Sequence, residues 1–186
     1  MLQTPGQHFP RPADAPYEHD PTLQGWPWIA GTHSWAGPTG LGLIALKVAG
    51  QGEHDAAQEA ERMLMNRQLP KGGWNYGNTR VFGMELHPMP ESTGIVLEAL
   101  SHRVPREKIQ KSLAYLRTRL EGLRPPRSLG WGLLGLAAWG EGLPAAHGLV
   151  AQSLESQERY GSYDTVCLAL LVVSLLAPRG LASLYQ

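Results

Sequence analysis

The sequence has no excess of charge of either sign, almost no cysteine and no long apolar segment. Lysine plus arginine and aspartate plus glutamate each number 16 in the 186 residues, so no broad positive field attracts phosphate backbones. Nucleic acid is therefore not expected as a partner. The single cysteine, Cys167, excludes an internal disulfide. The longest apolar run, 166–177, falls short of the roughly 20 residues that a membrane-spanning helix needs.

Residues 1–24 also lack the apolar run of a signal peptide, and five prolines are spread through them. We therefore expect a soluble, cytoplasmic protein. This composition cannot build a core and predicts an extended, proline-rich arm. The arm either wraps over the folded part or hangs loose. Residues 25–186 are expected to form one helical domain.

From Gly25 onward the pattern predicts helices and no convincing strand. In 105–121, for example, Ile109, Leu113, Leu116 and Leu120 recur at helical spacing on one face. The predicted helices are 38–50, 53–67, 91–102, 105–121, 127–139, 144–159 and 163–177.

These seven helices alternate between two kinds. The first, third, fifth and seventh are apolar nearly all round, whereas those between them are apolar on one side only. A helix that is apolar on every side must be buried, and a one-sided helix must cover it. The alternation predicts an inner and an outer layer, joined as helical hairpins.

An internal repeat agrees with this arrangement. Residues 39–46, which begin Thr-Gly-Leu-Gly, align without a gap with residues 93–100, and looser copies begin at Ser128 and Thr165. The four starts are 54, 35 and 37 residues apart, which is about the length of one helical hairpin.

A Gly-Gly-Trp segment connects the second and third predicted helices. Gly72 and Gly73 favour a break between helices, and the rings of Trp74 and Tyr76 can pack over a helix end while hydrogen-bonding through their polar tips. Residues 25–28, Gly-Trp-Pro-Trp, are a second copy of this segment.

The repeat resembles that of a known superfamily. Gln68 and the Gly72-Gly73-Trp74 segment, ahead of residues 90–100, are similar to the glutamine–tryptophan repeat of squalene–hopene cyclases and of protein prenyltransferase β subunits. Residues 25–46 look like another copy. The resemblance implies an α/α toroid whose inner helices line an apolar cavity for isoprenoids. With about seven helices, this chain would form an arc that a second copy or a partner chain could complete.

The chemical groups of those families differ from the residues present here. The Asp-rich stretch with which triterpene cyclases protonate their substrate is missing, and Asp164 stands where the prenyltransferases have a zinc-binding histidine. None of the seven histidines is spaced for a four-ligand metal site. The G-x-G-x-x-G pattern at 130–135 follows no strand, so it does not indicate dinucleotide binding. We expect no metal and no cofactor.

Three acidic residues are candidates for a catalytic proton donor. Glu91 and Asp164 stand in the first turns of apolar helices, where a carboxylate either caps the helix or points into the cavity with a raised pKa. Glu98 lies within an otherwise apolar helix. Glu98 lies either on a solvent-exposed edge of that helix or in the cavity as a functional acid, because burying a carboxylate without a partner costs free energy.

Aromatic residues are candidates for the ligand-binding wall. Trp131 and Trp139 are eight residues apart, which places them on nearly one face of a helix, and their rings can stabilise a carbocation. Trp28, Trp35 and Tyr163 complete the predicted ligand-binding set.

These expectations define two functions. In the first, the chain binds a polyprenyl or triterpene-like isoprenoid, and it acts as a cyclase if one of the three acids protonates an alkene. In the second, it is a non-catalytic helical-repeat protein that docks a protein partner or completes a toroid with another chain.

Overall fold

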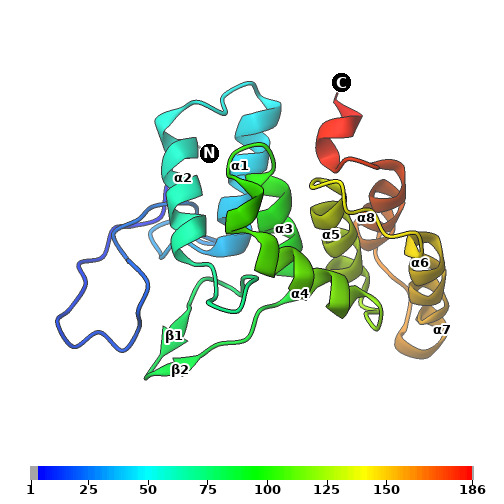
Figure 1. Cartoon of the computed structure of the whole chain (residues 1–186), viewed down its shortest axis with the longest axis horizontal. Coiled ribbons are helices and arrows are strands. Elements are labelled where there is room, and N and C mark those ends of the chain that lie inside the picture. Colours follow the sequence, from blue (N-terminus) through cyan, green and yellow to red (C-terminus); the bar gives the residue numbers. More distant parts are fainter. Residues whose placement is uncertain (1–3, 186) are drawn as a thin grey trace.

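The computed structural model describes residues 4–185 and shows an all-α protein (Figure 1). The fold class predicted from the sequence is therefore confirmed. The main helices are α1 (Ala36–Val48), α2 (Asp55–Asn66), α3 (Pro90–Leu100), α4 (Gln110–Leu120), α5 (Pro126–Ala137), α6 (Ala146–Glu155) and α8 (Thr165–Leu176). Short helices are η1 (Arg106–Lys108), α7 (Gln157–Tyr160) and η2 (Leu181–Leu184). No helix within residues 4–185 is long and apolar enough to cross a membrane.

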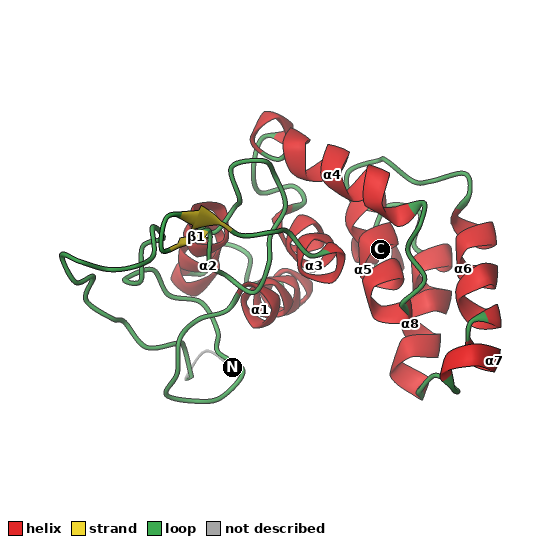
Figure 2. Cartoon of the chain, turned by 90° about the horizontal axis from the view of Figure 1, so that it is seen from below, coloured by secondary structure: helices red, strands yellow, loops and turns green. Residues whose placement is uncertain are grey.

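The apolar helices α1, α3, α5 and α8 lie side by side in one row, each in contact with the next (Figure 2). The amphipathic helices pack on this row: α2 contacts α1, α4 contacts α3 and α5, and α6 contacts α5 and α8. The structure thus has the two layers that the alternation predicts.

Glycine residues let neighbouring helices of the row approach closely. A Cβ atom added to Gly94 in α3 would lie 2.2 Å from the carbonyl oxygen of Trp131 in α5. A Cβ atom added to Gly135 in α5 would lie 2.6 Å from the carbonyl oxygen of Gly94. The two backbones are therefore in direct contact, and a larger side chain at either position would push α3 and α5 apart.

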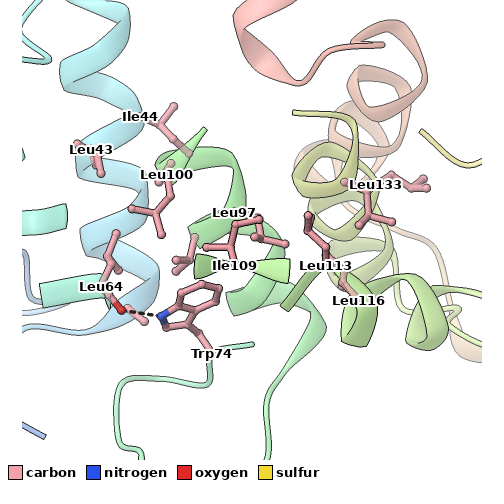
Figure 3. Close-up of a cluster of buried hydrophobic side chains, with 14 of the residues drawn as sticks. Leu43, Ile44, Leu64, Trp74, Leu97, Leu100, Ile109, Leu113, Leu116 and Leu133 are labelled. Carbon is pink, nitrogen blue, oxygen red and sulfur yellow. Dashed lines mark hydrogen bonds between the residues drawn. The ribbon is translucent and has the colours of Figure 1, made fainter. Parts of the chain in front are cut away.

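The core lies between the two layers. Leu113 and Leu116 of α4, which belong to the predicted apolar face, are at most 1% exposed. Figure 3 shows them facing the same cluster as Leu97 and Leu100 of α3. Trp74 is fully buried in this cluster, and its indole N–H donates to the carbonyl of Leu64 at 2.7 Å. Its predicted position over a helix end is confirmed, whereas Tyr76 is 58% exposed.

The internal repeat is present in three dimensions. The backbone N–H of Trp74 donates to the hydroxyl of Thr93 at 3.0 Å, and that of Trp26 donates to the hydroxyl of Thr39 at 2.9 Å. In both copies, a Gly-Trp segment is tied to the threonine near the start of the following inner helix. The two Gly-Trp segments that are similar in sequence therefore have the same local structure.

The proline-rich arm predicted at 1–24 continues as irregular chain up to the start of α1, and residues 4–35 are therefore called the arm below. The backbone N–H groups of Asp20 and Gln24 donate to the side chains of Asn66 and Glu59 of α2, at 2.9 and 3.1 Å. The ring of Trp26 packs on Gly42 of α1. Of the two expectations for the proline-rich segment, the structure shows the one in which it wraps over the fold.

The sequence pattern predicts no strand, but the structure has two short strands in one loop. Between α2 and α3, the strands β1 (Arg80–Val81) and β2 (Met84–Glu85) form a small antiparallel hairpin. Its turn residues, Phe82 and Gly83, both have positive φ angles, which suit a tight hairpin turn. Two residues per strand are too few to leave an alternating pattern in the sequence.

The expectation that α8 is buried on all sides is wrong for this chain. Val166, Val172 and Leu176 are 64%, 55% and 66% exposed, and Leu168 is 38% exposed. The reason is position: α8 is the last of the four apolar helices and packs on α5 and α6 (Figure 2), whereas α5 packs on α3, α4, α6 and α8. Leu133 of α5, which has neighbours on both flanks, is 4% exposed.

Candidate functional site

The three candidate acids lie in different environments, and Asp164 has a structural one. Its carboxylate accepts a hydrogen bond from the backbone N–H of Cys167 at 2.7 Å, which caps the N-terminus of α8. This hydrogen bond holds the pKa of Asp164 below its ordinary value, because it favours the charged form. Asp164 is thus an exposed carboxylate and a poor proton donor.

Glu91 lies in the first turn of α3, where it faces Arg127 of α5. The Nε atom of Arg127 is 3.5 Å from a carboxylate oxygen of Glu91, and the Glu91 side chain is 34% exposed. Glu91 therefore helps to join α3 to α5, and its side chain is not enclosed in an apolar cavity.

Glu98 is the candidate that the structure buries. It stands two residues before the end of α3, and its residue is 2% exposed. One carboxylate oxygen accepts the backbone N–H of Leu181 at 3.0 Å, and the other has no hydrogen-bond partner among residues 4–185. Burial raises the pKa of Glu98 from 4.5 to about 7, and the Lys47 charge and the Leu181 hydrogen bond oppose this rise only in part. Near neutral pH, Glu98 is therefore a mixture of acid and carboxylate.

Lys47 is the only charged residue of α1, and it reaches the same region. Its Nζ atom donates to the carbonyls of Glu98, Ala99 and Ser101 at 3.0, 3.2 and 3.1 Å. These carbonyls form the C-terminal end of α3, where a cation is favoured by the helix dipole. Burial lowers the pKa of Lys47. No ion pair within 4.0 Å joins Lys47 to Glu98 among residues 4–185, and the Lys47 charge offsets the effect of burial on Glu98 only in part.

A pocket of about 300 Å³ opens beside these two residues. Its ionisable side chains are Glu98, Lys47 and Tyr185. The rest of its lining is apolar: Ile44, Val48, Leu181 and Ala182. The volume is at the lower end of the range of about 300–1,000 Å³ for small-molecule sites. An apolar pocket with one convergent polar group is the usual form of such a site. This is the candidate functional site of the chain.

The predicted aromatic wall is not assembled around this pocket. The indole N–H of Trp139 donates to the carbonyl of Leu97 at 2.8 Å, and Trp139 lines a neighbouring open pocket. Trp131 is partly buried and packs against the core. Trp139 also lies beyond the end of α5 at Ala137, so the two tryptophans do not share a helix face.

The other three predicted ligand-binding residues are dispersed as well. Trp28 is 62% exposed and lies against Gly37. Trp35 immediately precedes α1 and lines a small pocket under the arm. The hydroxyl of Tyr163 donates to the carbonyl of Ser153 at 2.7 Å, which ties the segment before α8 to α6.

No family model, curated protein or solved structure matches this chain. The site is therefore described by its own geometry. Within residues 4–185, no group of three or more histidine, cysteine, aspartate and glutamate side chains is placed to hold a metal ion.

The sequence pattern identifies Glu98 as a candidate but does not predict the residues that surround it. An acid within an apolar helix was a visible signal, and so was Lys47, the only charge in the predicted helix 38–50. The residues that close the pocket, Leu181 and Tyr185, carried no signal, because they follow α8 and reach α3 only through the tertiary fold.

Proposed function

We propose that this chain binds a small, mainly apolar molecule of isoprenoid type in the pocket beside Glu98. The observation that supports the proposal is a buried carboxyl group, with one unpartnered oxygen, in the wall of an apolar pocket. The isoprenoid class rests on the resemblance of the Gly-Trp repeats, and the volume of about 300 Å³ favours a short isoprenoid over a triterpene.

Glu98 gives the pocket its chemistry. In its protonated form it donates an O–H to an oxygen of the bound molecule, and the apolar wall holds the hydrocarbon part. Its pKa, about 7, suits a proton donor at neutral pH. If the chain has cyclase-type activity, Glu98 is therefore the residue to which we assign the protonation step.

The test is the binding of geranyl methyl ether, an isoprenoid whose ether oxygen accepts hydrogen bonds but cannot donate them, measured by calorimetry at pH 5.5 and pH 8.5. We expect saturable binding at pH 5.5 that weakens by about tenfold at pH 8.5, because a carboxylate has no proton to donate. Glu98→Gln should bind equally at both pH values, since its amide donates at either. Glu91→Gln, a substitution of the same kind outside the pocket, should behave like the wild type.

Glu98 also has a purely structural explanation, in which it only holds residues 181–185 against α3. Glu98→Gln retains an acceptor for the N–H of Leu181. If neither geranyl methyl ether nor the longer farnesyl methyl ether binds at pH 5.5, or if both bind with the same affinity at the two pH values, the proposed role of Glu98 is wrong. Mass spectrometry of extracts after incubation with geranyl diphosphate or squalene would show whether product forms.

A second candidate function is association of two copies through α8. Val166, Val172 and Leu176 form an exposed apolar stripe, which monomeric proteins seldom leave uncovered. A two-fold contact of α8 with α8 would bury this stripe and lengthen the row of inner helices. We expect a particle of twice the 20.3 kDa chain mass in sedimentation experiments at micromolar concentration.

The matched control uses the opposite flank. Val172→Asp should return the particle to the mass of a single chain, whereas Ile29→Asp, at a residue of the arm that is 70% exposed, should leave it unchanged. A single-chain mass for the wild type at high micromolar concentration would contradict this second function.

A further inference from the structure

A second pocket, of about 200 Å³, lies between the arm and the helical domain. It is lined by residues of three separate segments. The middle of the arm contributes Tyr17, His19 and Pro21, its last residues before α1 contribute His33, Ser34 and Trp35, and the region after α2 contributes Arg67, Gly77 and Asn78. Its lining has more hydrogen-bonding side chains than that of the Glu98 pocket.

Arg67 follows α2 and is 5% exposed. It donates to the carbonyl of Gly77 at 2.7 Å and to the carbonyl of Asp20 at 3.3 Å, while its Nε atom has no hydrogen-bond partner among residues 4–185. No carboxylate oxygen of those residues lies within 4.0 Å of the guanidinium group. A buried guanidinium group is normally paired with an anion. Arg67 instead has an unpartnered Nε–H donor and no carboxylate neighbour among the described residues.

His19 stands on the other side of this pocket. It is 8% exposed, its ring stacks on Tyr17 with centroids 4.5 Å apart, and its Nδ1 atom has no partner among the described residues. Burial, helped by the positive charges of Arg67, Arg11 and His33, lowers the pKa of His19 to about 4. The carboxylate of Asp20 opposes this shift, but its Oδ1 atom accepts two hydrogen bonds from Thr22.

We propose that this pocket is a binding site for a phosphate group. The planar guanidinium group of Arg67 matches the geometry of a phosphate, and charge-assisted hydrogen bonds are the strong ones. His19, His33 and Asn78 add donors around the same space. The volume is below the range of about 300–1,000 Å³ for drug-sized ligands, which suits a small anion or one phosphorylated end of a larger molecule.

This site is independent of the proposed isoprenoid pocket. Trp35 precedes the first turn of α1, whereas Lys47 is near its last residue, and a helix of 13 residues is about 20 Å long. The two sites therefore lie toward opposite ends of α1. Failure of one proposal leaves the other unaffected.

The test is calorimetry with inorganic phosphate at constant ionic strength, against chloride as the reference. Glycerol 3-phosphate is the second arm, because it shows whether the site accepts a phosphate monoester as well as the free ion. We expect saturable binding of phosphate, weakened by about tenfold or more in Asn78→Asp, which places a negative charge in the pocket. Gln51→Glu, the same change of charge at an exposed residue outside it, should bind as the wild type does.

A second measurement keeps the proposal falsifiable should a variant fold poorly. The titration of His19 can be followed by NMR in the wild-type chain, with and without phosphate. Because a bound anion favours the imidazolium form against Arg67, Arg11 and His33, phosphate should move the pKa of His19 back toward 6.5. An unchanged His19 titration together with no saturable phosphate binding would show that Arg67 only fastens the arm to α2. Equal weakening in Asn78→Asp and Gln51→Glu would also overturn the proposal.

Discussion

The two flanks of the row of inner helices end in different ways. The α1 flank is covered by the arm, where the ring of Trp26 packs on Gly42 and that of Trp28 lies against Gly37. The α8 flank has no such cover among residues 4–185, and Val172 and its neighbours are exposed. Both helices are apolar nearly all round in sequence. The comparison shows that an apolar helix is buried only where a neighbouring segment covers it.

The largest expected effect is the loss of the cover on the α1 flank. Trp26→Ala should lower the free energy of unfolding by about 3–5 kcal/mol, because Trp26 is 7% exposed and its removal leaves a cavity over α1. Urea unfolding measures this change. Trp28→Ala, at a residue that is 62% exposed, should cost less than about 1 kcal/mol. Equal losses in the two variants would mean that the arm does not cover α1 through Trp26.

The next effect is the pH dependence of the free energy of unfolding, to which His19 in the arm and Glu98 in α3 contribute with opposite sign. His19, in the arm, has its pKa lowered from 6.5 to about 4. Its contribution to stability is therefore complete above pH 6.5 and is lost as the pH falls toward 4. Glu98, which contacts Leu181, has its pKa raised from 4.5 to about 7, so its contribution is complete below pH 4.5 and is lost as the pH rises toward 7.

The two residues can be separated by substitution. In a Glu98→Gln background, we expect stability to fall by about 1–3 kcal/mol between pH 6.5 and pH 4, and His19→Gln should remove most of that slope. Urea unfolding in phosphate-free buffer at several pH values measures both. A slope that His19→Gln does not change would show that His19 is not buried between the arm and the helical domain.

An effect of comparable size is expected from added volume at the covered flank. A Cβ atom on Gly42 would lie 2.4 Å from the ring of Trp26, so Gly42→Ala should cost about 1–3 kcal/mol. Much of this cost should vanish in the Trp26→Ala background, because the two residues are in contact. Additive losses would contradict the packing of the arm on α1.

The smallest effect is expected at the bare flank. Val172→Ser should change the free energy of unfolding by no more than about 0.5 kcal/mol at a concentration where the chain is a monomer, because the side chain is 55% exposed. Leu171→Ala, at the adjacent buried residue, should cost about 2–5 kcal/mol. A large loss for Val172→Ser under dilute conditions would mean that another segment covers α8.

Much of the fold could be predicted because local patterns persist in the structure. The helices begin and end within a few residues of the predicted ranges; α4, for instance, is Gln110–Leu120 with η1 at Arg106–Lys108 inside the predicted 105–121. The similar Gly-Trp and threonine positions of the two repeats make the same hydrogen bond, at 2.9 and 3.0 Å. Such features depend on residues close in the sequence or repeated in it.

The candidate site could be predicted only in part. The periodicity identified Glu98 as an unusual acid in an apolar helix but left open whether it faced water or a cavity. The answer depends on residues 181–185, and Leu181 is 83 positions away from Glu98 in the sequence. Asp164 and Glu91 had the same sequence signal as a cavity acid and proved to be a helix cap and an ion-pair partner. The aromatic residues were chosen by type and spacing, which do not specify convergence on one point.

The amino-acid sequence by itself determined the all-α class, the order of inner and outer helices and the repeated Gly-Trp connection, because these follow from short-range periodicity and from glycine and proline at helix ends. Only the tertiary structure decided which apolar helix is covered, which acid is buried and where Arg67 and His19 meet. These properties arise from contacts between segments far apart in the chain, and the free energy of burying a side chain depends on what packs against it.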